Sequence, residues 1–118
     1  MNLITERGFE KVSFNDYEPF TKEIAHGFDY RMIKSKSINN KTVEFVWLQL
    51  ESGCKRDFVE TEGFEVIYMV QGKVDFKVGD EVTVIREGDT FFFDGCTPHV
   101  PFNPFNEPAI MIVIYFLY

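Results

Sequence analysis

From residue 28 to its end, the sequence alternates short apolar stretches with turns that contain glycine or proline. This regular spacing of short apolar stretches and turns restricts the chain to folds built from short strands. The turn signals recur at intervals of about 8–12 residues, which is typical of β sandwiches and barrels. No long segment has the helical period of an amphipathic α-helix. We therefore predict an all-β fold.

The clearest strand signal is a hairpin centred on Gly79-Asp80. Apolar and charged residues alternate along Lys73–Val78, and Glu81–Arg86 continues the alternation after the turn. A two-residue connection that begins with glycine suits a tight antiparallel hairpin. Further strands are expected at Lys41–Glu51, Glu65–Val70, Thr90–Phe93, His99–Asn103 and Ala109–Tyr118.

The composition fits one folded domain. The chain has 118 residues, of which 45% are hydrophobic, so it can bury a core of its own. Its longest apolar run, Ala109–Tyr118, is about half as long as a membrane-spanning helix must be. Residues 1–20 contain no apolar segment of the kind found in signal peptides. Because there are only two cysteines, a disulfide framework is not indicated, and we expect a cytoplasmic protein.

The charge excludes one class of partner. Nineteen acidic residues against twelve basic ones give a net charge of −7, and such a surface repels the phosphate backbone of nucleic acids. We therefore expect no nucleic-acid binding by this chain alone, and no membrane association.

Two stretches of the sequence resemble the paired motifs of the cupin family. Residues 53–72 resemble the first motif, G-x5-H-x-H-x3-E-x6-G, and residues 88–103 resemble the second, G-x5-P-x-G-x2-H-x3-N. The resemblance covers about residues 41–117 and is strongest to the sensor cupins that are fused to bacterial helix-turn-helix regulators. It implies a cupin-type jelly-roll barrel, or double-stranded β-helix, at 41–118. Residues 1–40 would then form an N-terminal arm and first strands that pack on the barrel.

The resemblance also implies a metal site, of which this sequence keeps half. In metal-binding cupins the two histidines and the glutamate of motif 1 and the histidine of motif 2 bind one ion. Val59 and Thr61 occupy the two histidine positions here, and only Glu65 and His99 keep their ligand types. Because iron and zinc sites use three or more protein ligands, we expect no cofactor. A divalent ion held weakly by Glu65 and His99 is the alternative, with His26 as the other histidine to examine.

The alternation of a strand extends this site. Residues two or four positions from Glu65 share its inward face, and Trp47 and Gln49 are expected to line the barrel as well. The interior would suit a small, mostly apolar molecule with one hydroxyl, carbonyl or carboxyl group. The predicted ligand-binding residues are Glu65, His99, Thr61, Val59, Gln49, Trp47, Ile67 and Met69.

Two classes of function are compatible with these residues. The first is a small-molecule-binding cupin domain with a degenerate metal site, acting as a sensor or regulatory domain. The alternative is a metal-dependent cupin enzyme, either a dioxygenase or an isomerase or lyase in which Glu65 and His99 act as base and acid. Fold analogy does not select between these classes.

A homodimer is expected from the apolar residues that a single barrel cannot cover. Ala109–Tyr118 is apolar on both faces, and Val46, Leu48 and Leu50 are taken as the outward set of their strand. The three phenylalanines 91–93 alternate between faces, so the middle one is expected to be exposed. Exposed apolar rows are usually interfaces.

Overall fold

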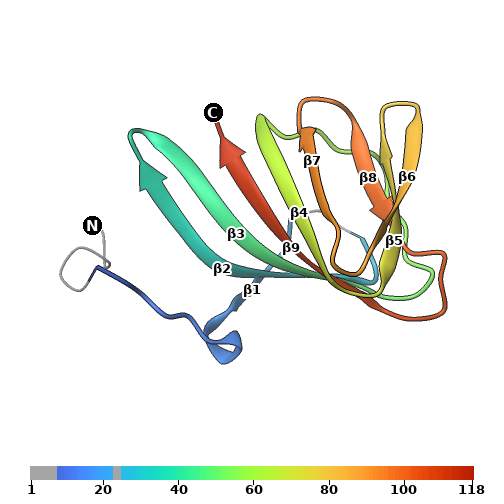
Figure 1. The fold of residues 1–118 in the computed structure, drawn as a ribbon, viewed down its shortest axis with the longest axis horizontal. Helices are drawn as coiled ribbons and strands as arrows, with labels where there is room; N and C mark the ends of the chain where they lie inside the picture. The colour runs from blue at the N-terminus through green and yellow to red at the C-terminus, as the bar shows by residue number, and fades with distance from the viewer. Residues whose placement is uncertain (1–7, 23–24) are drawn as a thin grey trace.

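The computed structural model describes residues 8–22 and 25–118. Two antiparallel sheets pack against each other (Figure 1), with strand orders β1-β2-β3-β9-β4-β7 and β6-β5-β8. No helix within the described ranges is long and apolar enough to cross a membrane. In chain order the elements are η1 (Phe14–Asp16), β1 (Glu18–Phe20), β2 (Phe28–Ile38), β3 (Lys41–Leu50), β4 (Gly63–Gln71), β5 (Lys73–Val78), β6 (Glu81–Arg86), β7 (Thr90–Asp94), β8 (His99–Phe102) and β9 (Ala109–Leu117).

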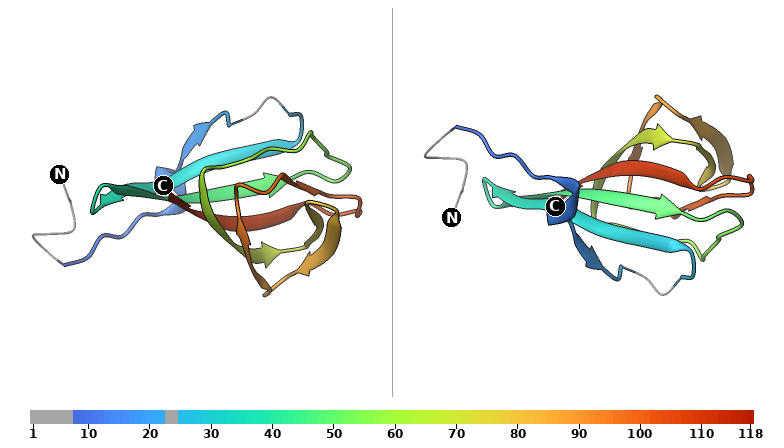
Figure 2. Two further views of the ribbon diagram at one scale, coloured as in Figure 1. Left: turned by 90° about the horizontal axis from the view of Figure 1, so that it is seen from above. Right: turned by 90° about the horizontal axis from the view of Figure 1, so that it is seen from below.

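The prediction of an all-β jelly roll is confirmed. Each strand expected from the alternation is present, with ends that differ by no more than a few residues. The hairpin between β5 and β6 turns at Gly79-Asp80, and Gly79 has a φ of +57°, which a glycine adopts without strain. Figure 2 shows the long strands β2, β3 and β9 side by side, with the small sheet packed on one side of the large one.

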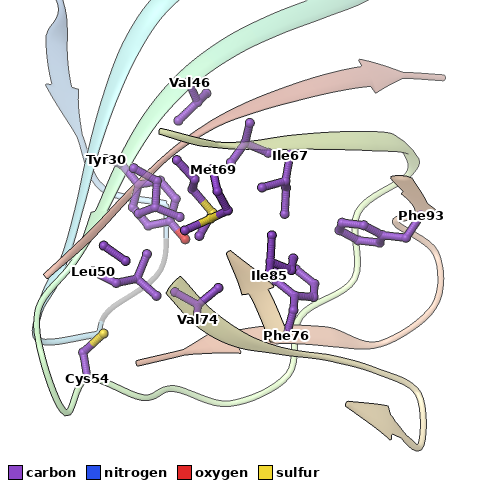
Figure 3. Packing of buried hydrophobic residues seen from close by; sticks show 14 of the residues in the cluster. Tyr30, Val46, Leu50, Cys54, Ile67, Met69, Val74, Phe76, Ile85 and Phe93 are labelled. Carbon is purple, nitrogen blue, oxygen red and sulfur yellow. The ribbon is translucent and has the colours of Figure 1, made fainter. Parts of the chain in front are cut away.

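The hydrophobic core lies between the two sheets, where alternate residues of the inner strands meet. Ala109, Met111 and Val113 of β9 are at most 1% exposed, because the period of a strand sends every second side chain to the same face. Figure 3 shows the buried side chains of both sheets pointing toward one another. Phe76 and Ile85 are the large contributions from the small sheet.

The inward face of β3 differs from the prediction. Val46, Leu48 and Leu50 were expected outside, but they are 0–3% exposed and belong to the core. Trp47, expected inside, lies on the opposite face, where its ring packs edge to face on Phe14 with a centroid distance of 5.3 Å. Both faces of β3 are apolar, so hydrophobic patterning alone does not distinguish them. The N-terminal segment with η1 covers the outer face.

Strand β2 belongs to the large sheet. It pairs with β3 from Phe28↔Leu50 to Ile38↔Lys41, with one bulge between Met32 and Lys34. The two strands are joined by Asn39-Asn40, whose φ angles of 50° and 65° are those of a tight hairpin turn. The segment before residue 41 therefore supplies both β1 and β2 to one edge of the sheet.

Candidate functional site

Three parts of the chain meet in one pocket between the sheets. Glu65 comes from β4 of the large sheet, His99 begins β8 of the small sheet, and the segment 57–61 runs beside β8. Val59 and His99 exchange two backbone hydrogen bonds of 3.0 Å, and the Thr61 amide donates to the Gly95 carbonyl at 2.8 Å. As a result Val59, Thr61, Glu65 and His99 line the same pocket.

Glu65 and His99 face each other inside the protein. Oε2 of Glu65 lies 3.1 Å from Nε2 of His99, and both side chains are 4% exposed. Nδ1 of His99 lies 2.8 Å from the Thr97 carbonyl oxygen, which can only accept, so Nδ1 carries a hydrogen. Nε2 is then the ring nitrogen that faces the Glu65 carboxylate.

Oε2 of Glu65 is a buried acceptor with unused capacity. Its approach to Nε2 lacks hydrogen-bond geometry, so among the described residues this oxygen has no hydrogen-bond partner. A buried polar atom left in this way costs about 1–3 kcal/mol. A donor group of a bound molecule would remove that cost.

Aromatic rings fix the imidazole of His99. The Phe76 ring stacks on it at 6.2 Å with an interplanar angle of 11°, and the Phe93 ring meets it edge to face at 4.7 Å. Such packing holds the ring in one orientation. The remaining walls are aliphatic, from Leu48, Ile67, Met111 and Val113.

The pocket is narrow, and two cationic side chains are part of its lining. Its free space is about 20 Å³, which is room for about one water molecule. Lys22 and Arg56 also line it, with the Lys22 ammonium 3.5 Å from the centre of the Tyr115 ring. A larger molecule fits only if lining side chains move.

Most of the residues predicted for the site lie in the interior, as expected. Glu65, His99, Thr61, Val59 and Ile67 line the pocket together. Met69 has the expected inward direction but is fully buried in the core.

The other two predicted residues were wrong as pocket residues. Trp47 and Gln49 lie on the outer face of β3, because the inward positions of that strand are 46, 48 and 50. His26 is also remote from the pocket lining: its side chain is 98% exposed and lies 3.7 Å from the Glu51 carboxylate.

Sequence reasoning missed four polar residues of the pocket. Tyr115 could have been found, because it shares its face of β9 with Met111 and Val113. Tyr30 is brought in by β2 and Lys22 by a loop outside both motifs, whereas Arg56 lies at an unspecified position of the first motif.

The residues present do not fit a tightly bound metal ion. No three His, Cys, Asp or Glu side chains of the described segments form a group that could hold a metal. Val59 offers no donor atom, and a threonine hydroxyl is a poor replacement for an imidazole. Glu65 and His99 remain the only donors of ligand type at the four positions, so the expectation of no tightly bound metal stays a prediction.

Two antiparallel sheets that enclose a pocket, with a carboxylate and an imidazole facing each other, define a small jelly-roll barrel. The model of the Cupin_2 family, "Cupin domain", matches residues 51–115, which include both motifs. The chain therefore belongs to the cupin family.

Solved structures with the same fold include an RmlC-like cupin from Shewanella frigidimarina, with 22% identity, 93% of each chain covered and a TM-score of 0.71. The polyketide cyclase RemF from Streptomyces resistomycificus has 13% identity over 93% of this chain and 80% of that chain, with a TM-score of 0.76. The Cupin_2 domain of an XRE family transcriptional regulator from Enterobacter cloacae has 15% identity over 79% of this chain and 98% of that chain, with a TM-score of 0.69.

No curated protein matches the sequence. At these identities the similar structures establish the fold alone. They include both an enzyme and a regulator domain, which agrees with the rule that one fold carries many functions.

Proposed function

We propose that this cupin domain binds a small organic molecule between its sheets, without a tightly held metal ion. The observation that carries the proposal is Oε2 of Glu65, a buried acceptor without a hydrogen-bond partner in the described part of the chain. It borders a pocket whose other walls are mainly apolar. A few convergent polar groups in an apolar pocket are the usual design of a small-molecule site.

The pocket chemistry supports a particular kind of ligand. A hydroxyl or N–H group would donate to Glu65, and an apolar body would contact Leu48, Ile67 and Val113. Lys22 and Arg56 in the lining favour a ligand that carries a carboxylate and disfavour polycations. The small free space favours a compact molecule.

The test is to identify what the purified protein retains. Native mass spectrometry of the wild-type protein should show a bound organic compound that is released on denaturation. His99→Ala and Glu65→Ala should lose it, whereas Glu62→Gln, at an exposed position next to Thr61, should keep it. A panel of small hydroxy acids tested by thermal shift provides a second readout. Equal retention by all four proteins, or no stabilisation by any compound of the panel, would contradict the proposal.

The juxtaposition of the Glu65 carboxylate and the His99 imidazole favours a second candidate, an enzyme that moves a proton. As base and acid, the pair could take a proton from a ligand carbon on the Glu65 carboxylate and return it to the same or a neighbouring carbon. The retained compound would then exchange a carbon-bound hydrogen for deuterium in D₂O. Exchange that Glu65→Gln abolishes would favour the enzyme, and binding without exchange would favour a sensor or carrier.

A further inference from the structure

A second hollow adjoins the pocket of Glu65 and His99. It lies where β6 and β7, each the last strand of its own sheet, leave the space between the sheets open. Its volume is about 560 Å³. We call it the side hollow; its lining residues are Phe76, Val78, Glu81, Val82, Thr83 and Phe91.

Most walls of the side hollow come from the inward faces of strands. On β5, Phe76 and Val78 share the face of the buried Val74. Register places Thr83 of β6 opposite Phe76, and Glu81 opposite Val78. Side chains of directly opposite residues lie on the same face of a sheet. The side hollow is therefore part of the space between the sheets and not a depression of their outer surface.

The Phe76 side chain separates the two spaces. Among the described residues it alone lines both the side hollow and the pocket. Its ring stacks on His99 and lies 5.3 Å from the Phe91 ring and 5.1 Å from the Phe93 ring, measured between centroids. The ring thus stands between the imidazole of the pocket and the aromatic wall of the side hollow.

This partition is held by packing alone. A phenyl ring forms no ion pair and donates no hydrogen bond, so turning it breaks only ring contacts. A cavity of about 150 Å³ holds a benzene molecule, and the side hollow, at about 560 Å³, therefore has room for the ring. With the ring in its present place, the pocket has only about 20 Å³ of free space. Turning Phe76 would join this space to the side hollow.

We propose that the side hollow is a second compartment of the ligand site, and that the Phe76 ring opens and closes the passage to the Glu65–His99 pair. The inference rests on the proposed function, because it concerns how the ligand of that pocket is accommodated. Phe76 is then the residue that sets the size of the ligand.

The walls of the side hollow select one kind of ligand end. Val78, Val82 and Phe91 offer hydrocarbon surface, and the Glu81 carboxylate disfavours a negative charge. The ligand would combine a hydroxyl or N–H group, which donates to Glu65, with an aliphatic or aromatic end that extends past the turned ring.

Diethyl pyrocarbonate tests the passage without the natural ligand, because it modifies a neutral imidazole. The chain has two histidines: His26, 98% exposed, serves as the reference, and His99, 4% exposed, reports entry. Peptide mass spectrometry measures both rates. Thr83→Trp fills the side hollow beside Phe76, and it should slow the modification of His99 at least about threefold, since the rate follows the fraction of open protein.

Val84→Trp is the matched control for this variant. Val84 is the next residue of β6, 38% exposed and outside the lining of the side hollow. A tryptophan there should leave the rate of His99 unchanged. Circular dichroism verifies that each variant is folded.

Phe76→Ala removes the partition. Because a minor open state is typically about 0.1–10% populated, a permanently open passage should accelerate the modification of His99 at least about tenfold relative to His26. Adding Thr83→Trp should reverse most of this gain, and adding Val84→Trp should not. If Phe76→Ala does not fold, Phe76→Leu takes its place with a smaller gain in the same direction.

Three results would overturn the proposal: a wild-type His99 that does not react, an unchanged rate in Thr83→Trp, or equal slowing by both tryptophan variants. The proposed function has a separate readout, the compound that the purified protein retains. A retained compound with an unchanged rate in Thr83→Trp would leave that function intact and reject the passage. A rate that depends on residue 83 in a protein that retains nothing would contradict the proposed function and not the passage.

Discussion

Glu65 and His99 come from different sheets and meet with 3.1 Å between carboxylate oxygen and ring nitrogen, each side chain 4% exposed. The contact therefore joins the two layers of the barrel at the end of its pocket. It also brings two buried polar groups close enough to interact electrostatically, which offsets part of the cost of burying each of them.

This dependence predicts strong coupling between the two positions. Glu65→Leu or His99→Leu alone should lower the free energy of unfolding by about 1–3 kcal/mol, because the remaining partner stays buried. The double variant should lose less than the sum, since two apolar side chains leave nothing unpaired. Urea denaturation of the four proteins measures the cycle. Strict additivity would show that the residues do not interact, and failure of either single variant to fold would make the pair structural rather than ligand-binding.

The four positions of the family metal site converge here with two donors missing, which predicts a gain-of-function experiment. Wild-type protein should contain no stoichiometric iron, nickel or zinc. Val59→His combined with Thr61→His should supply the missing imidazoles and bind about one ion per chain. Metal analysis after purification measures both, and adding His99→Ala should reduce the content. A wild-type protein with one tightly bound ion per chain would contradict this prediction.

Asn103 should be essential for stability, because its side chain joins two loops. It is fully buried, donates to the carbonyls of Leu50 at 3.2 Å and Glu107 at 2.8 Å, and accepts from the Phe105 amide at 3.1 Å. Asn103→Ala should cost at least about 1–3 kcal/mol of unfolding free energy.

The control is Asn106→Ala, at an exposed position of the same loop, which should change stability by less than about 0.5 kcal/mol. Urea denaturation that gives similar values for both variants would show that these hydrogen bonds add little.

The two cysteines should differ in reactivity. Burial raises the pKa of the Cys54 thiol to about 11 and shields it from reagents, whereas the Cys96 thiol, whose pKa is also raised by desolvation and by Asp94, is exposed. A raised pKa keeps the thiol protonated at pH 8, and the protonated thiol is not the nucleophile. Ellman's reagent should therefore modify one thiol per native chain at pH 8 and the second only on unfolding.

The pH dependence follows from the same shift. Alkylation of Cys54 in the folded protein should accelerate as the pH rises toward about 11, because the thiolate fraction grows over that interval. In Cys96→Ser the fast reaction should disappear. Two fast thiols in the wild-type protein would show that Cys54 is accessible.

The strands and the pocket positions could be predicted for one physical reason. Period-two alternation identifies strands with one apolar face, and the motif spacing carries Glu65 and His99 to the same interior. Alternation does not show which face of β3 points inward, because both faces are apolar. The outer face, with Trp47, packs on Phe14, which lies more than thirty residues away in the sequence. Asn39-Asn40 is a turn signal readable from the sequence, because asparagine adopts the positive φ angles of a tight hairpin more readily than most residues. Lys22 and Arg56 enter the pocket through loops, whose positions only the fold determines.

The alternating sides of β4 give its residues unequal weight in stability. Replacing the odd-numbered residues from 65 to 69 by aspartate in turn should lower the unfolding midpoint, because these side chains are buried. The same change at Phe64, Tyr68 and Val70, which are exposed, should lower the midpoint much less. The loss of stability measured along this strand should therefore alternate from one residue to the next.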